Sequence, residues 1–345
     1  MIEEVYLKDF RNYEEAGFRF SKGLNAIIGD NGLGKTNLLE ALFFLLQGKT
    51  MRGSEPKELV RWGTEKAQLG IKVSGGAAVE KRIEICEEGR KEKGKLGGIR
   101  AVFFKPDDIW MIKGGPESRR KYLDEAVVEI KRGFRVTLRE YHRVLRQRNE
   151  AIRAVKRGSG DIGLVRSWNP LLARWGRMVV EERAEGLKEL EKEMDATTGR
   201  WGVGKLEARL YSSMGDFFGE EDKLIRKIER MESAEIGRGM TLIGPHRDEV
   251  IFNLGGRSAR RDCSQGEQKL IAMVWKMALA ETIARNTREK VILLMDDCLS
   301  ELDRRNRLLV LRELEKWEQV FVTHAEDLEE LKGFNKIFLG RENRG

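Results

Sequence analysis

A run of residues near the N-terminus fits the pattern G-x-x-x-x-G-K-[ST], with glycines, a lysine and a hydroxyl residue at fixed spacing. These residues are Gly29, Asp30, Asn31, Gly32, Leu33, Gly34, Lys35 and Thr36. A strand pattern, 23–28, precedes the run, and a helical pattern, 35–47, follows it and ends at Gly48. Between a strand and a helix, such a loop aims backbone N–H groups and the positive helix end at phosphate oxygens. Lys35 would reach the β- and γ-phosphates and Thr36 would bind Mg²⁺, so the run predicts a nucleoside triphosphate site.

A pair of acids, Asp296 and Asp297, follows the apolar strand pattern 291–295. We expect Asp296, at the end of a buried strand, to hold Mg²⁺ directly or through water. Asp297 would polarise the attacking water. It is one methylene shorter than a glutamate, which predicts slow hydrolysis because alignment of the water dominates this chemistry. The alternative is that Asp297 only caps the turn that follows.

A third motif opens the helical pattern 267–284 and consists of Ser264, Gln265, Gly266, Glu267 and Gln268. It resembles the signature loop of ABC-type ATPases, with Gln265 in place of the first glycine. In those ATPases the loop contacts nucleotide bound to a second copy, where a serine and helix-opening N–H groups suit a γ-phosphate. Residues 300–303, ending in Asp303, resemble the D-loop of the same junction. The alternative is that Ser264 is an ordinary helix N-cap.

The order of these motifs and the patterns between them predict the architecture. Residues 67–104 alternate between apolar strand patterns and charged turns, which predicts an antiparallel subsheet on the nucleotide domain. Helical spacing follows from 117 to a break at 158–160, then over about 164–194 and 216–233. A strand at 241–243 is expected to pair with 250–252. His324 follows the strand pattern 320–323, at the position where ABC-type heads have a histidine that senses γ-phosphate.

The predicted fold class is therefore α/β: an ABC-type P-loop ATPase head with an antiparallel β subdomain and an inserted helical second lobe. The insertion lies between the phosphate loop and the signature motif. We expect the head to comprise 1–115 and 239–345 and the helical lobe to comprise 116–238. The candidate catalytic residues are Lys35, Asp297 and His324, with ATP and Mg²⁺ as the expected ligands.

Several segments together resemble the RecF family of bacterial recombination mediators, which is related to the chromosome-maintenance and double-strand-break-repair ATPases. They are 7–13, the phosphate loop with Asn37 after it, 113–124, 244–248, 264–269 and 296–303. Segments 113–124 and 244–248 discriminate best, because they have no general chemical meaning and other ABC-type ATPases lack them. The resemblance implies that Arg11 and Asn12 lie beside the nucleotide.

The resemblance also implies an activity. A member of this family is a weak, DNA-stimulated ATPase that forms an ATP-dependent homodimer on duplex, gapped or junction DNA. It acts with RecR and RecO to load RecA in recombinational repair and replication.

The charge of the chain fits a polyanionic partner. The chain has 345 residues, a net charge of +8 and a pI near 9.3. The basic side of residues 119–157 is the candidate DNA surface, and its alternative is a solvated helix face balanced by nearby glutamates. The DNA candidates are Arg139, Arg143, Arg146, Arg148 and Arg153.

Other classes of protein are less consistent with the sequence. The three cysteines, Cys86, Cys263 and Cys298, are far apart, which argues against structural zinc or a disulfide framework. No apolar run is long enough for a bilayer and the N-terminus does not resemble a signal peptide, so we expect a cytoplasmic protein with no membrane partner. Two further hypotheses share the nucleotide motifs: the ATP-binding subunit of a membrane transporter, and a non-hydrolysing scaffold whose dimer state ATP sets.

Overall fold

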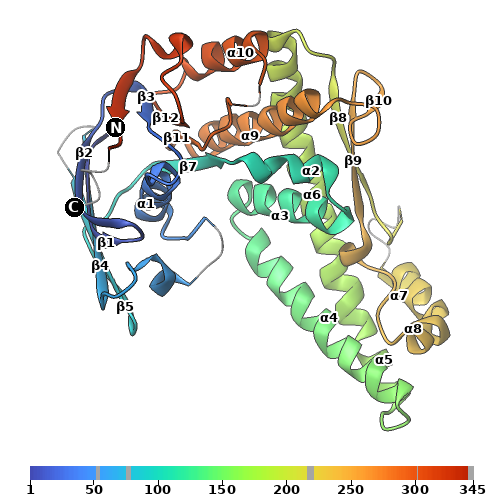
Figure 1. Ribbon diagram of the computed structural model, residues 1–345. Coiled ribbons are helices and arrows are strands. Elements are labelled where there is room, and N and C mark those ends of the chain that lie inside the picture. The colour runs from blue at the N-terminus through green and yellow to red at the C-terminus, as the bar shows by residue number, and fades with distance from the viewer. Residues whose placement is uncertain (52–54, 75–78, 216–220, 301, 341–345) are drawn as a thin grey trace. The chain divides into compact units, whose positions relative to one another are not determined.

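The computed structural model describes residues 1–51, 55–74, 79–215, 221–300 and 302–340. The chain separates into two compact units, which are described one at a time (Figure 1). Unit 1 contains Met1–Asp108 and Ile283–Gly345, and unit 2 contains Ile109–Thr282. Among the described residues, no helix is both long and apolar enough to span a membrane.

An antiparallel sheet forms one layer of unit 1, in the order β2-β1-β4-β5-β6. Along β1, Val5 and Leu7 are buried while Tyr6 and Lys8 are exposed, the alternation of a sheet with one face on the core. The antiparallel sheet expected from residue 67 onward is therefore confirmed for β4, β5 and β6. The strands are β1 (Ile2–Phe10), β2 (Tyr13–Arg19), β4 (Lys66–Val73), β5 (Val79–Cys86) and β6 (Gly89–Lys93).

A parallel sheet forms the second layer, in the order β13-β3-β12-β11-β7. The expectation that residues 101–104 belong to the antiparallel sheet was wrong, because β7 pairs with β11 in parallel, from Lys290↔Ile99 to Met295↔Phe104. The continuous apolar run 101–104 is typical of a parallel strand, which lacks the alternation of a half-exposed one. The strands are β3 (Gly23–Ile28), β7 (Ile99–Phe104), β11 (Lys290–Met295), β12 (Gln319–His324) and β13 (Asn335–Phe338).

Helix α1 (Lys35–Gln47) packs with both sheets in one hydrophobic core. Its Leu38, Leu42 and Leu45 have no exposed surface. The helix ends as expected at Gly48, whose φ of 64° suits a glycine C-cap. The remaining elements of unit 1 are η1 (Pro56–Leu59), α10 (Arg304–Leu314) and η4 (Glu329–Leu331), together with η2 (Pro106–Ile109) at the boundary between the units.

Unit 2 is mainly helical, and its long helices α4 and α6 lie side by side (Figure 1). The helical pattern from 117 forms two helices, α3 and α4, and the pattern 164–194 forms α5 and α6. The third expected helix corresponds to α7 and α8, and its residues 216–220 lie outside the described ranges. The helices are α2 (Trp110–Lys113), α3 (Pro116–Ile130), α4 (Phe134–Lys156), α5 (Ile162–Ser167), α6 (Asn169–Trp201), α7 (Glu221–Arg230) and α8 (Glu232–Arg238); α9 (Gln265–Thr287) reaches into unit 1.

A small antiparallel sheet in unit 2 replaces the pairing expected of residues 241–243. Strand β9 (Glu249–Leu254) pairs with β8 (Leu206–Tyr211) and β10 (Arg257–Ser258), and η3 (Pro245–Arg247) precedes it. Residues 241–243 do not form a strand, because their backbone N–H groups bond to side chains instead of to a neighbouring strand. Thr241 N donates to the Asn149 side chain, and Leu242 N donates to the Glu235 side chain.

The compact units also divide at different positions from the expected lobes. The expected head resumes at 239, whereas residues 239–282 cluster with the helices. The pairing of β9 with β8, which lies in the inserted segment, accounts for this difference.

Candidate nucleotide site and its partner motifs

The phosphate loop connects β3 to α1, as the sequence predicts. Gly32 and Gly34 have φ angles of 83° and 103°, a region that L side chains rarely adopt. A Cβ at Gly34 would lie 2.7 Å from Asn12 Nδ2 and 2.9 Å from the Tyr13 hydroxyl. Glycine is therefore needed at Gly34 for its backbone conformation and for the close approach of the segment at Asn12 and Tyr13.

The two residues that begin α1 have polar partners within unit 1. Lys35 Nζ donates to the loop carbonyls of Gly29, at 2.5 Å, and Asp30, at 3.1 Å. Thr36 Oγ1 lies 2.9 Å and 2.8 Å from the two carboxylate oxygens of Asp296. The fold therefore brings together the hydroxyl and the carboxylate expected to hold Mg²⁺.

Asp296 directly follows β11 in a buried position, and two hydroxyls donate to it. Besides Thr36, Thr323 Oγ1 donates to Asp296 Oδ1 at 2.8 Å and accepts from the backbone N of Asp297 at 2.9 Å. Burial raises the pKa of the Asp296 carboxyl above its usual range, and the hydrogen bonds from Thr36 and Thr323 oppose this rise. A buried carboxylate beside a hydroxyl is a donor set that suits a hard divalent cation, which would favour the ionised form.

Asp297 is conformationally strained and incompletely bonded. Its φ is 46°, in the left-handed region that costs a non-glycine residue free energy. Its Oδ1 is buried and has no hydrogen-bond partner among the described residues. Such an acceptor also carries a desolvation penalty, which a bound water would relieve. Both features fit a carboxylate held for a ligand, whereas a capping role would need a bond to the carboxylate.

His324 ends β12 and is 6% exposed. Its Nδ1 lies 2.8 Å from Glu326 O and 3.0 Å from Glu326 N, so the following turn holds the ring. Its backbone carbonyl accepts from Gly29 N at 3.3 Å, which connects the strand end to the first residue of the phosphate loop. The γ-phosphate-sensing role of His324 stays a prediction.

The N-terminal segment 9–13 braces the phosphate loop. Asn12 Nδ2 donates to Leu33 O at 3.4 Å, and Asn37 Nδ2 donates to Asn12 Oδ1 at 2.7 Å. Arg11 instead directs its guanidinium to Glu40 on α1, with bonds of 2.9 Å and 3.1 Å. Asn12 and Asn37 thus touch the loop region directly, while Arg11 orients the segment through a buried carboxylate.

The signature residues form a capping box at the start of α9. Ser264 Oγ accepts from Glu267 N at 3.3 Å, and the Glu267 carboxylate accepts from Ser264 N at 2.7 Å. Hydrogen bonds from Arg257 and then from Ser264 lower the pKa of Glu267 to about 2. Gln268 Nε2 donates to the carbonyls of Ala259, Arg260 and Cys263, at 3.0 to 3.3 Å.

Ser264 is therefore an N-cap, as the alternative interpretation stated, and it is also exposed together with Gln265. Because its oxygen is the acceptor in the cap, its hydroxyl proton remains able to donate to a ligand. Asp303 is likewise a cap: its two carboxylate oxygens accept from Asn306 N and Nδ2, both at 2.8 Å. Glu301, the second residue of the segment 300–303 that resembles the D-loop, lies outside the described residues.

The basic candidates on α4 differ in their environments. Arg139, Arg143, Arg146 and Arg153 are exposed, and the first two pair with Glu140 at 3.6 Å and 2.9 Å. The prediction that Arg148 contacts DNA at the surface was wrong, because its side chain is buried and is bonded to Asn169, Thr241 and Glu235.

Helical spacing explains why Arg148 is buried. It lies seven residues after Tyr141 and four before Ile152, on the stripe that α4 buries. Arg119, expected on the same basic side, is also buried and pairs with Glu249.

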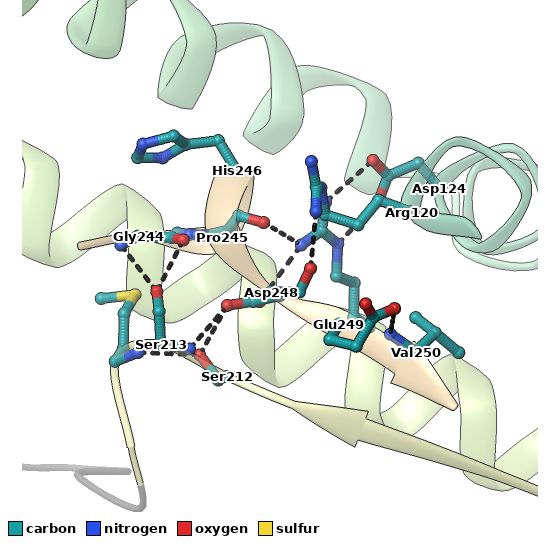
Figure 2. A network of polar contacts seen from close by, with 12 residues as sticks. Arg120, Asp124, Ser212, Ser213, Gly244, Pro245, His246, Asp248, Glu249 and Val250 are labelled. Atoms are coloured by element: carbon teal, nitrogen blue, oxygen red, sulfur yellow. Dashed lines mark hydrogen bonds and ion pairs between the residues drawn. The ribbon is translucent and has the colours of Figure 1, made fainter. Parts of the chain in front are cut away.

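Sequence reasoning missed a buried polar network in unit 2 that joins the segments 113–124 and 244–248 (Figure 2). At its centre Arg183 donates to both carboxylate oxygens of Asp124, at 2.7 and 2.9 Å, and to Asp248 Oδ2 at 3.2 Å. Asp248 Oδ1 accepts from Ser212 Oγ at 2.9 Å and Ser213 N at 3.0 Å. The available signal was the position of Arg183 on α6, three residues after Val180 and four before Leu187, which are both buried.

His246 joins the same region through Tyr141 on α4. Its Nε2 lies 3.1 Å from Thr241 O, and its Nδ1 contacts the Tyr141 hydroxyl. Since a carbonyl only accepts, Nε2 carries the proton and Nδ1 accepts from Tyr141. Burial lowers the pKa of His246 to about 4, so the ring is neutral near pH 7.

Comparison with known proteins gives consistent results. Residues 1–339 match the model of the RecF/RecN/SMC N terminal domain. The chain is 35% identical over 344 residues to the DNA replication and repair protein RecF of Desulfitobacterium hafniense, covering 93% of this chain and 92% of the relative. It is 32% identical over 351 residues to the RecF of Carboxydothermus hydrogenoformans, with 97% of each chain covered.

A solved structure of the recombination mediator protein RecF with ATPrS, in the RecFOR pathway, is similar with a TM-score of 0.85. It shows 28% identity and covers 99% of this chain and 96% of that one. The similarity in fold thus extends over nearly the whole of both chains.

Proposed function

The chain belongs to the RecF family, and we propose that it is an ATP-dependent DNA-binding protein of recombinational repair and replication. ATP would join two copies through their nucleotide sites, the dimer would hold duplex, gapped or junction DNA, and slow hydrolysis would release it. The observation that supports this proposal most directly is the convergence of Thr36, Asp296 and Asp297 beside the phosphate loop.

Each residue of this site has a distinct part in the proposed reaction. Backbone N–H groups of 29–36 and the Lys35 ammonium would bind the phosphates. Thr36 and Asp296 would hold Mg²⁺, which would supply charge neutralisation at the phosphate oxygens. The unpartnered oxygen of Asp297 would accept a proton of the attacking water and align it. His324 would respond to the γ-phosphate from the end of β12.

The dimer interface would complete the site. Ser264, Gln265 and the helix start behind them would contact the γ-phosphate bound to the second copy, with Asp303 near the same junction. The capping box supports this proposal, because it holds the serine and the first N–H groups of α9 in one geometry before any ligand binds.

DNA binding would rest on phosphate contacts by exposed basic residues of α4. Arg146 and Arg153 are exposed, and no ion pair of either side chain is recorded among the described residues, whereas Arg139 and Arg143 share Glu140. RecR and RecO are the proposed protein partners, and RecA loading the proposed outcome, by membership of the family.

Fluorescence anisotropy on duplex, single-stranded and gapped DNA would test the proposal, with ATP, ADP or no nucleotide over a salt series. We expect ATP-dependent binding that weakens steeply with salt and is lost in Lys35→Met. Binding that is weak and indifferent to nucleotide would contradict the DNA clamp. ATP-dependent dimerisation without turnover, even with DNA present, would favour the non-hydrolysing scaffold.

A further inference from the structure

We propose that Trp62 is the stacking platform for the purine base of the bound nucleotide, a specificity element outside the phosphate loop. The proposal rests on the proposed function, since it takes nucleotide binding at residues 29–36 as given. It follows from three features of unit 1: the exposure of Trp62, the turn that carries it, and the segment that joins this turn to the phosphate loop.

Trp62 is 97% exposed, the highest value among the large hydrophobic side chains that the structure describes as exposed. An exposed indole ring leaves a large apolar surface in contact with water. Stacking against a flat ligand would bury this surface, which is favourable. Isolated exposed apolar residues are common on protein surfaces. The significance of Trp62 therefore depends on how firmly the chain holds it and on what lies nearby.

A bonded turn presents the indole. Both Thr64 N, at 3.1 Å, and Thr64 Oγ1, at 2.9 Å, donate to Arg61 O, which closes the turn 61–64. Gly63 has a φ of 86°, as the third residue of a type II turn requires. Trp62 is the second residue of this turn, so its backbone is fixed while its side chain projects outward.

The turn is fastened to the N-terminal segment 9–13. Arg61 N donates to Asp9 O at 2.8 Å, and the Arg61 guanidinium pairs with Glu14 at 3.0 Å. Phe10 forms a β-bridge with Val60 just before the turn. Movement of the turn would break several of these bonds, so the backbone that carries Trp62 is held in place.

The other end of the same segment holds the phosphate loop. Asn12 donates to Leu33 O at 3.4 Å, and the Tyr13 hydroxyl donates to Gly34 O at 3.0 Å. The three peptide links from Asp9 to Asn12 span at most about 10 Å, which is comparable to the length of a nucleoside between its phosphate and its base. The segment therefore connects the phosphate loop to the turn that carries Trp62 along a path short enough for one nucleotide to contact both.

Backbone strain in this segment supports a functional geometry. Asp9 and Arg11 have φ angles of 50° and 52°, which are unfavourable for residues with a Cβ. Such strain persists where the surroundings fix the backbone, and it is concentrated at binding sites. Here it lets one short segment reach both the phosphate loop and the turn of Trp62.

The charges near the turn favour a base over a nucleic acid backbone. Arg61 pairs with Glu14 and Asp9, Lys57 with Glu55, and Lys66 with Glu84. A DNA-binding surface offers its cations to phosphates, whereas the cations described here are matched by carboxylates of the chain itself. An aromatic ring among paired charges suits stacking with a neutral π system.

The test compares ligands with and without a base. Binding of ADP and of pyrophosphate, each with Mg²⁺, is measured by calorimetry on the full chain and on the variants Trp62→Ala and Trp62→Phe. We expect Trp62→Ala to weaken ADP binding about tenfold and to leave pyrophosphate binding unchanged. Trp62→Phe should keep most of the ADP affinity. Trp110→Ala is the matched control, because Trp110 is 53% exposed but lies in unit 2.

Several outcomes would overturn the proposal. Equal ADP affinity in the unmodified protein and in Trp62→Ala would do so, and so would an equal loss for ADP and pyrophosphate, which would indicate a disturbed phosphate loop. Loss of DNA binding or of ATP-dependent dimerisation with unchanged ADP affinity would assign Trp62 to DNA or to a second copy instead. If neither ligand bound the unmodified protein, the proposed function itself would fail, a result distinct from the others.

Discussion

The guanidinium of Arg148 and the carboxylate of Glu235 form an ion pair inside the helical unit, with Nη2 2.6 Å from Oε2 and each side chain 1% exposed. The other nitrogens of Arg148 donate to Asn169 Oδ1 at 3.0 Å and to Thr241 Oγ1 at 2.9 Å. Arg148 thus joins α4 to α6, to α8 and to the chain that leads into η3. Helix α4, which carries the candidate DNA surface, is therefore held in place on its buried side by its own Arg148.

Removal of this arginine should affect stability. Arg148→Ala would leave Glu235 buried and unpaired, which should lower the free energy of unfolding by about 3–5 kcal/mol. Replacing both residues, as in Arg148→Leu with Glu235→Leu, should recover much of this loss. Denaturant titration of each variant measures its free energy of unfolding.

The control Arg146→Ala should change stability by no more than about 0.5 kcal/mol. It should lower the slope of log affinity for DNA against log salt concentration by about 1. A stable Arg148→Ala protein that fails to bind DNA would contradict the structural role.

Strain at Asp297 should be separable from its chemistry. Asp297→Gly removes the unfavourable φ of 46° and the unpartnered carboxylate oxygen. The free energy gained by relieving this strain and this unpartnered oxygen exceeds the cost of the greater entropy that glycine gives the unfolded chain. The nucleotide-free variant should therefore be about 1 kcal/mol more stable than the unmodified protein. ATP turnover should fall by about 10²-fold or more, because the acceptor for the attacking water is gone.

Denaturant titration without nucleotide and steady-state ATPase assays would measure the two effects of Asp297→Gly. The control Asp303→Ala loses an N-cap and should be about 1 kcal/mol less stable. A destabilised Asp297→Gly protein would mean that the carboxylate of Asp297 has a structural partner.

Local patterns were sufficient to predict the elements that position the nucleotide site. The strand before the phosphate loop, helix α1 with its C-cap Gly48, and the strand just before Asp296 follow from short-range periodicity and from glycine. Their pairing follows because parallel strands place their carboxyl ends at one edge of the sheet. The phosphate loop and the acids were therefore predictable as neighbours.

Contacts distant in sequence were not predictable in the same way. Whether a charged residue on a helix is exposed depends on what packs there, and Arg148 and Arg183 lie on buried stripes where carboxylates from other segments meet them. The pairing of β9 with β8 had no local signal either. Spacing from Tyr141 through Leu145 to Ile152 was the one available indication that Arg148 faces inward.

The two proposed roles of Ser264, as a cap and as a ligand of the γ-phosphate, should respond differently to substitution. Ser264→Asp keeps an N-cap acceptor and should retain nearly the full stability of the protein. It adds a negative charge where the γ-phosphate of a second copy would bind, so ATP-dependent dimerisation should be lost.

Light scattering with and without ATP, beside thermal unfolding, would give both quantities for Ser264→Asp. Ser264→Ala is the complementary variant and should cost about 1 kcal/mol of stability. Normal dimerisation of Ser264→Asp would limit Ser264 to its capping role.

His246 should make stability depend on pH in a defined window. Burial lowers its pKa from 6.5 to about 4 in the folded protein, so the unfolded chain binds the proton more readily between these values. The neutral ring contributes fully to the free energy of unfolding above pH 6.5, and this contribution is lost as pH falls toward 4, by roughly 3 kcal/mol in all. Protonation would also replace the acceptor at Nδ1 with a donor facing the Tyr141 hydroxyl.

The variant His246→Gln cannot titrate at this position, so its free energy of unfolding should fall less than that of the unmodified protein between pH 7 and pH 5. Denaturant titrations of both proteins at these two pH values measure the difference, and parallel losses would show that His246 titrates normally in the folded state.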